Sequence, residues 1–164
     1  MAIGSNLVSA DGRSPLQTCR DAAAALGGLP GWRLARLSPW YRTIPDPPLP
    51  GAPLFVNGLA LLEGEGEGDP AALLAALHGL EGAAGRLRPF PNAPRTLDLD
   101  LIAVGDLRRE EAPILPHPRA HLRRFVLRPL ADVWPGWRHP VLERTVEELL
   151  AGLPDENPPE PIAD

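Results

Sequence analysis

Apolar and polar residues alternate one by one through a short stretch in the second half of the chain. Leucine takes every second position and polar residues take the positions between, in the order Thr96, Leu97, Asp98, Leu99, Asp100 and Leu101. Neighbouring side chains of a strand lie on opposite faces, so the pattern predicts a strand with one buried leucine face. The opposite face then carries two carboxylates about 7 Å apart.

Three other segments have the pattern of strands. Residues 2–4 form a short apolar run, residues 32–41 alternate, and residues 54–62 are almost continuously apolar. The run at 2–4 is barely long enough to pair with a neighbour. We therefore expect either a short first strand or one that begins upstream of Met1.

Helix signals fall between these strands. Ser14-Pro15 and Asp69-Pro70 each place a capping side chain before a proline, which is typical of a first helical turn. Apolar residues then recur at helical spacing, and the two segments end near residues 27 and 85. A capping box at residues 145–148 predicts a last short helix. Residues 125–130 are apolar but are broken by Pro129, so they are not counted as a helix.

The order of these segments predicts an α+β fold. The alternation βαββαβ is typical of a ferredoxin-like sandwich, with an antiparallel sheet and helices on one of its faces, followed here by a C-terminal extension. A chain of 164 residues is long enough for one domain with a real core. We assign residues 1–153 to that single domain. Residues 154–164 are acidic and rich in proline, which predicts a disordered tail.

Composition narrows the possible functions. The chain has no lysine, which excludes a P-loop, a protein kinase and a Schiff-base enzyme. Residues 86–144 hold 11 arginines and 7 acidic residues, whereas the whole chain has a net charge of −5. A locally basic segment suits a small anion in a pocket better than a nucleic acid.

No apolar run reaches the length of a membrane span, no signal peptide is present, and Cys19 is the single cysteine. We therefore expect a cytoplasmic protein that binds neither membrane nor nucleic acid.

Four groups of residues are candidates for chemistry. Asp98 and Asp100 offer hard oxygen ligands, which suit Mg²⁺ that is also bound by phosphate. Two basic groups could hold phosphates, one formed by Arg86, Arg88 and Arg95 and the other by His117, Arg119, His121, Arg123 and Arg124. Phe55 with Asn57 could stack on a flat heterocycle and hydrogen-bond to its edge. Taken singly, each group could equally be a solvated face or part of the core, but together they favour metal-assisted phosphoryl transfer.

Motifs along the chain resemble those of bacterial 6-hydroxymethyl-7,8-dihydropterin pyrophosphokinase, an enzyme of folate biosynthesis. The similar segments are AIGSNL at 2–7, SPWYRTIP at 38–45, FVN at 55–57, Glu81 with Gly85-Arg86, PRTLDLD at 94–100, PHPR at 116–119, RRFVL at 123–127 and PL at 129–130. The resemblance runs in order from residue 2 to about residue 153. Residues 95–100 and 117–130 are its most specific parts.

The resemblance implies an activity and a set of roles. The βγ-pyrophosphoryl group of ATP would pass to the hydroxymethyl group of the pterin, releasing AMP, in a protein expected to be a monomer. Asp98 and Asp100 would hold two Mg²⁺ ions and, with Arg86 and Arg95, form the catalytic set. ATP would be bound by Glu81, Arg86, Arg95, His117 and Arg123. The pterin would be bound by Thr43, Phe55, Asn57 and Phe125.

Three other functions are compatible with parts of the sequence. A ferredoxin-like RNA-binding module would need exposed aromatic residues on its first and third strands and a basic sheet, which this chain lacks. A metal-dependent phosphoesterase would use the same acidic pair. A catalytically weak nucleotide- and pterin-binding regulatory domain is the main alternative, and the intact pair Asp98 and Asp100 disfavours it.

Overall fold

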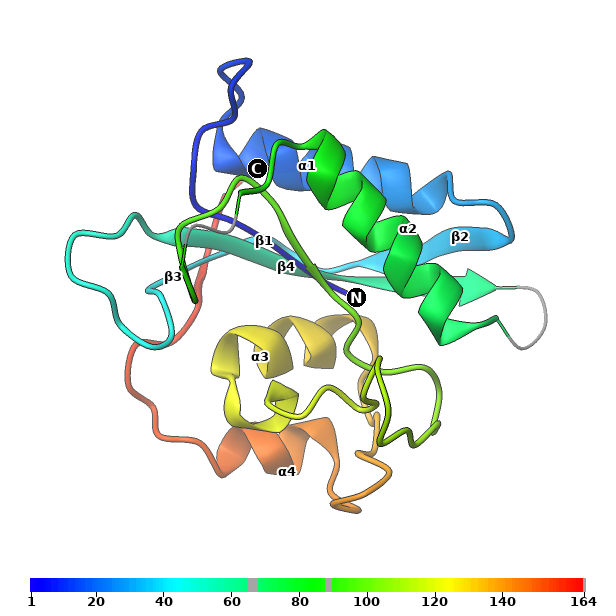
Figure 1. The fold of residues 1–164 in the computed structure, drawn as a ribbon. Helices are drawn as coiled ribbons and strands as arrows, with labels where there is room; N and C mark the ends of the chain where they lie inside the picture. Colours follow the sequence, from blue (N-terminus) through cyan, green and yellow to red (C-terminus); the bar gives the residue numbers. More distant parts are fainter. Residues whose placement is uncertain (65–67, 88–89, 164) are drawn as a thin grey trace.

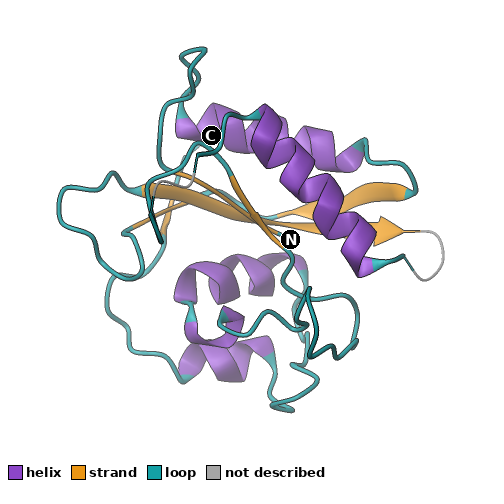
Figure 2. Cartoon of the chain, viewed as in Figure 1, coloured by secondary structure: helices purple, strands orange, loops and turns teal. Residues whose placement is uncertain are grey.

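The computed structural model describes residues 1–64, 68–87 and 90–163 of the chain. A six-stranded antiparallel sheet forms the middle layer, and helices pack on both of its faces (Figures 1 and 2). The strands are β1 (Ala2–Ser5), β2 (Trp32–Leu37), β3 (Tyr41–Thr43), β4 (Phe55–Gly64), β5 (Asp98–Asp100) and β6 (Glu160–Pro161). The helices are α1 (Pro15–Gly27), α2 (Pro70–Ala83), α3 (Arg124–Val133) and α4 (Val146–Ala151), with a 3₁₀ turn at Ala120–Leu122.

The long strand β4 organises the sheet. The strands lie in the order β5-β1-β4-β3-β6, and β2 pairs with the half of β4 that β3 leaves free. One row of partners crosses the sheet: Asp98, Gly4, Asn57, Tyr41 and Pro161. Partners in an antiparallel row point to the same face, so this row brings side chains from distant parts of the sequence together.

Helices α1 and α2 cover one face of the sheet, where the core contains the leucines of β5 and its flanks. Leu97, Leu99 and Leu101 are each no more than 5% exposed, which confirms the alternation predicted for this strand. The predicted helix starts are confirmed as well. The side chains of Ser14 and Asp69 accept hydrogen bonds from the backbone N–H groups of the first turns of α1 and α2.

The prediction that helices lie on one face is confirmed for α1 and α2, but the C-terminal part of the chain places helices on the other face. Helices α3 and α4 lie on the opposite face from α1 and α2, against a second apolar core that includes Leu59 of β4 (Figure 1). The cause is α3, which continues through Pro129. A proline removes one helical hydrogen bond, but burial of the stripe Val126, Leu127 and Leu130 outweighs that local cost.

The single strand predicted over residues 32–41 is divided. β2 and β3 both pair with β4, but a register shift interrupts β2 between Leu34 and Arg36, and Pro39 follows the end of β2. Ser38 bridges the interval, since its Oγ accepts a hydrogen bond from the backbone N–H of Leu59 at 2.9 Å. Thr43 is the last residue of β3.

The structure also differs from the disordered tail predicted for residues 154–164. Arg124 holds the start of this segment by donating hydrogen bonds to the carbonyl oxygens of Leu153 and Pro154. At the far end, Glu160–Pro161 pairs with β3, and the backbone N–H of Ile162 donates to the carbonyl of Trp40 at 2.8 Å. Composition alone could not predict this, because backbone hydrogen bonds and one partly buried isoleucine supply the order. Within the described ranges, no helix is long and apolar enough to cross a bilayer.

Candidate functional site

The two acidic residues of β5 lie on the face of the sheet opposite α1 and α2. Asp98 and Asp100 flank the buried Leu99, and both are half-buried. Gly4 of β1 stands between Asp98 and Asn57 in the row across the sheet. A Cβ atom at Gly4 would lie 2.8 Å from Asn57 Oδ1, so only glycine leaves that side chain its room.

Arginines surround Asp98. Arg86 Nη1 lies 2.5 Å from Asp98 Oδ1, and Arg95 Nε lies 3.2 Å from Oδ2. Arg86 also pairs with Glu81, whose Oε1 accepts a hydrogen bond from the backbone N–H of Leu99 at 2.8 Å. Glu81 is therefore a buried link between the end of α2 and the strand that carries the acidic pair.

Arg86 has a donor to spare beside Asp98. Its Nε atom is buried and has no hydrogen-bond partner among the described residues, whereas Arg95 Nε is engaged in the ion pair with Asp98. An unpaired buried donor is costly, so Arg86 suits an anion with several acceptor oxygens, such as phosphate. Arg88, predicted to belong to the same group, lies outside the described residues.

Asp100 has a different environment. Burial, and then the neighbouring charge of Asp98, raise the pKa of the Asp100 carboxyl above its usual value. His117, Arg123 and Arg95 oppose that rise. The backbone of His117 donates to the carbonyl of Ile102 at 2.8 Å, which places it beside the end of β5. Burial lowers the pKa of the His117 imidazole, and the neighbouring charge of Asp100 opposes that shift.

Two phenylalanines face the same region from different elements. Phe55 begins β4 and Phe125 lies in the first turn of α3. An arginine covers each ring: Arg95 lies 5.3 Å from the centroid of Phe55, and Arg123 lies 5.4 Å from that of Phe125. Between them, Asn57 donates a hydrogen bond from Nδ2 to Thr43 Oγ1 at 2.6 Å.

Eight of the eleven predicted site residues line one small cavity of about 40 Å³. The eight are Thr43, Phe55, Asn57, Arg95, Asp98, Asp100, Arg123 and Phe125. Of the other three, Arg86 forms an ion pair with Asp98 and Glu81 forms one with Arg86. The charge of His117 affects the pKa of Asp100. The sequence thus predicted residues that the fold brings together, although it could not predict which of them contact one another.

Asp46 is a site residue that was not predicted from the sequence. Asp46 lines the cavity and its Oδ2 lies 3.8 Å from Arg123 Nε. An acidic residue in a proline-rich loop facing a basic segment was the available signal, but its partner is 77 residues away in the sequence. Sequence spacing cannot predict such a pair.

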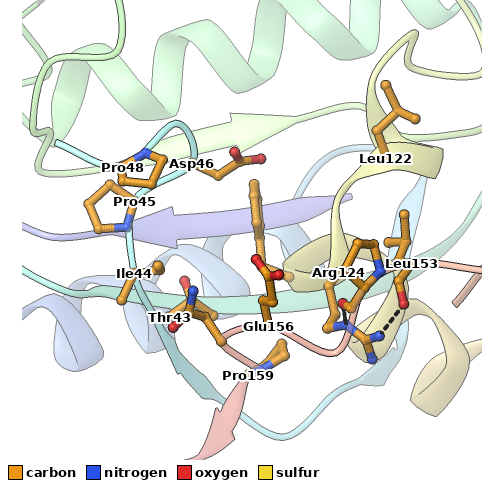
Figure 3. Close-up of a pocket in the computed structure, with 13 residues that line it drawn as sticks. Thr43, Ile44, Pro45, Asp46, Pro48, Leu122, Arg124, Leu153, Glu156 and Pro159 are labelled. Carbon is orange, nitrogen blue, oxygen red and sulfur yellow. Dashed lines mark hydrogen bonds between the residues drawn. The ribbon is translucent and has the colours of Figure 1, made fainter.

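Two larger cavities adjoin this site. One, of about 480 Å³, is lined by Arg86, Leu87, Phe90, Pro91, Asn92, Ala93 and Arg95. The other, of about 240 Å³, lies between the loop after β3 and the C-terminal segment, with Phe125 in its wall (Figure 3). Arg124 reaches the carbonyl of Leu153 at the edge of this second cavity (Figure 3).

Comparison with known proteins identifies the family. The family model described as 7,8-dihydro-6-hydroxymethylpterin-pyrophosphokinase matches residues 1–135. The chain belongs to this family. The predicted resemblance is confirmed, and the residues that it placed at a site are those that the fold gathers around one cavity.

Named relatives cover most of the chain. A 2-amino-4-hydroxy-6-hydroxymethyldihydropteridine pyrophosphokinase of Pseudomonas aeruginosa is 42% identical over 161 residues, 95% of this chain and 91% of the relative. Its namesake from Synechocystis is 38% identical over 137 residues, 82% of this chain and 68% of the relative. A third, from Haemophilus influenzae, is 33% identical over 134 residues, 81% of this chain and 79% of the relative.

The donor set fits the magnesium that such a reaction requires. Two carboxylates stand on one face of a strand, and the described residues contain no group of three or more His, Cys, Asp or Glu side chains that could hold a metal. Mg²⁺ commonly takes one or two carboxylates and completes its shell with water and phosphate oxygens. A pair of aspartates beside two arginines is therefore suitable for magnesium bound to a polyphosphate.

Proposed function

We propose that this protein transfers the βγ-pyrophosphoryl group of ATP to 6-hydroxymethyl-7,8-dihydropterin, giving the pterin diphosphate and AMP in folate biosynthesis. The observation that carries the proposal is the cavity where an acidic pair, arginines, two phenylalanines and an asparagine meet. Membership of the pyrophosphokinase family agrees with this set of residues. Magnesium and ATP are the implied cofactor and co-substrate.

Asp98 and Asp100 would hold two Mg²⁺ ions on the triphosphate. When bound, magnesium would neutralise negative charge on the phosphates. In the structure Asp98 is paired with Arg86 and Arg95, so binding of the metal requires these arginines to exchange partners. Phosphate oxygens offer them equivalent acceptors, and the unpaired Nε atom of Arg86 favours that exchange.

Arg86, Arg95 and Arg123, with His117, would bind the phosphates. The cavity of about 480 Å³ beside Arg86 and Arg95 has room for the nucleotide. Fixed positive charge near the transferred group stabilises the negative charge that develops during phosphoryl transfer. No carboxylate or histidine among the described residues has an evident role as a strong base, so we expect catalysis by alignment and charge neutralisation.

Phe55 and Phe125 would enclose the pterin ring, and Asn57 and Thr43 would hydrogen-bond to its edge. A cavity of about 40 Å³ has room for about one or two water molecules, not for a bicyclic ring. Arg95 and Arg123 therefore have to leave the two phenylalanine rings before the pterin can stack between them. Movement of the arginines toward phosphates would clear both ring faces at once.

A turnover assay tests this proposal directly. Protein, Mg²⁺ and ATP are incubated with and without 6-hydroxymethyl-7,8-dihydropterin, and AMP is measured by chromatography. The proposal predicts AMP only when the pterin is present, in equal amount to the pterin diphosphate formed. Binding of both substrates without AMP would instead support a regulatory domain, which no feature of the site favours. The ferredoxin-like connectivity and the monomeric state stay predictions.

A further inference from the structure

Three polar side chains join β3 to α3 on the face of the sheet that carries the site. The Tyr41 hydroxyl donates a hydrogen bond to Asp132 Oδ2 at 2.5 Å, and Arg128 Nε donates to the Tyr41 oxygen at 3.3 Å. Arg128 and Asp132 also form an ion pair one helical turn apart. We call these three residues the β3–α3 latch. The mechanism proposed above uses none of them.

The latch is built to persist at neutral pH. Tyr41 is 3% exposed, and burial together with the bond to Asp132 raises the pKa of its phenol. The hydroxyl therefore remains a donor. A buried hydroxyl bonded to a carboxylate makes a strong and directional contact, whereas the apolar packing of α3 on β4 is non-directional. The latch therefore adds directional contacts that fix where along the sheet this helix is held, together with the hydrogen bond from Arg36 Nη1 to the carbonyl oxygen of Val133 at 3.3 Å.

The strand and the helix that the latch joins both carry residues of the predicted pterin pocket. On the strand side, Tyr41 pairs with Asn57 across the sheet, and Thr43 lies two residues further along the same face. On the helix side, Asp132 lies seven residues after Phe125, which is two turns, or about 10 Å, along the axis. One short link thus relates the helix that carries Phe125 to the strands that carry the ring-binding polar groups.

We propose that Tyr41 is a positioning residue that sets the spacing between Phe125 and the Phe55–Asn57 side of the pocket. Stacking depends on that spacing, because an aromatic ring must fit between two others at van der Waals distance. When Arg95 and Arg123 leave the rings, the latch keeps α3 in place so that the pocket does not collapse. This role rests on the function proposed above and adds a determinant of pterin affinity that does not contact the substrate.

The substitution Tyr41→Phe tests the proposal because it removes one oxygen atom and keeps the buried ring. We expect the dissociation constant and the KM for the pterin to rise about tenfold, as for loss of one hydrogen bond to a charged group. We expect kcat and the affinity for a non-hydrolysable ATP analogue to change less than twofold. Asp132→Asn retains an acceptor oxygen for the phenol, so it should lose less pterin affinity than Tyr41→Phe does.

A control separates positioning from general stability. Leu77→Val shortens a fully buried side chain of α2, on the opposite face of the sheet, and should lower the melting temperature without changing pterin affinity. The proposal is overturned if Tyr41→Phe binds the pterin as tightly as the original chain. It is also overturned if Leu77→Val weakens pterin binding equally, or if Tyr41→Phe weakens binding of both substrates equally. Failure of the unsubstituted protein to bind the pterin would instead refute the proposed function.

Discussion

Glu81 offers the sharpest test of how the site is held together. Its carboxylate is buried, accepts a hydrogen bond from the Leu99 backbone at 2.8 Å and pairs with Arg86. The substitution Glu81→Ala leaves that N–H without its acceptor, which costs about 1–3 kcal/mol, and removes one charge partner from a guanidinium that is 7% exposed. Arg86 keeps Asp98, so we expect a total loss of about 3 kcal/mol in the free energy of unfolding.

A second glutamate of the same chain provides a comparison for the size of this stability loss. Glu63 also pairs with an arginine, but its side chain is 54% exposed and that of Arg33 is 71% exposed. Glu63→Ala should therefore cost less than about 1 kcal/mol. Glu81→Gln keeps an acceptor for the Leu99 N–H and should fall between the two alanine variants.

Urea denaturation followed by circular dichroism measures these differences. For a chain of this size, a loss of about 3 kcal/mol corresponds to a melting temperature lower by about 6–12 °C. If Glu81→Ala destabilises the protein no more than Glu63→Ala does, Glu81 does not link α2 to β5. A role for Glu81 confined to ATP binding would then account better for its place in the site.

Four further predictions concern turnover, pterin binding, acid stability and the C-terminal segment. Asp100→Asn should reduce turnover at least about 100-fold in the AMP assay, because a metal ligand is lost. The circular dichroism spectrum should stay unchanged, because the substitution breaks no ion pair that holds the fold. Turnover close to that of the original chain would contradict the role of Asp100. Asn57→Ala should weaken pterin binding about tenfold and ATP binding far less, as calorimetry with each substrate would show; equal losses would contradict the assignment. Burial, and then the nearby His121, lower the pKa of His139, so the folded state favours the neutral ring. The neutral ring therefore stabilises the folded state fully above a pH of about 6.5, the pKa of a histidine in the unfolded chain. This stabilisation is lost as the pH falls from there through the lower pKa that the ring has in the folded protein. In His139→Asn, the amide oxygen can still accept the hydrogen bonds that two backbone N–H groups donate to Nδ1 of His139. The stability of this variant in urea should therefore depend less on pH between pH 7.5 and 5. Removal of residues 154–164 should raise the KM for the pterin more than that for ATP, because β3 loses the strand that covers its edge; unchanged KM values would show that β3 holds its place without β6.

The parts of the fold with a local signal could be predicted from the sequence. Ser14-Pro15 and Asp69-Pro70 mark helix starts through contacts made within one turn, and the alternation around Leu99 identifies β5. Helix α3 could not be predicted in this way. Pro129 is unfavourable locally, and only the apolar core beneath α3 compensates for it.

The candidate site could be predicted as a set of residues but not as a set of contacts. Alternation and residue types indicated most of them, including Asp98 and Phe55, and the resemblance to a family added Thr43, Glu81 and Phe125. The contacts of Glu81 with the backbone of β5, and of Asp46 with Arg123, depend on tertiary structure. The β3–α3 latch depends on it as well, since its residues stand 87 and 91 positions apart.

The central claim is that Asp98 and Asp100 bind magnesium on the nucleotide beside a pterin held between two phenylalanines. A crystal structure with Mg²⁺, a non-hydrolysable ATP analogue and 6-hydroxymethylpterin would test it most directly. We predict metal density bridging both aspartates and the phosphates, the pterin ring between Phe55 and Phe125, and Arg95 moved from its ring to a phosphate. Metal bound elsewhere, with Asp98 still paired to Arg86 and Arg95, would contradict the claim.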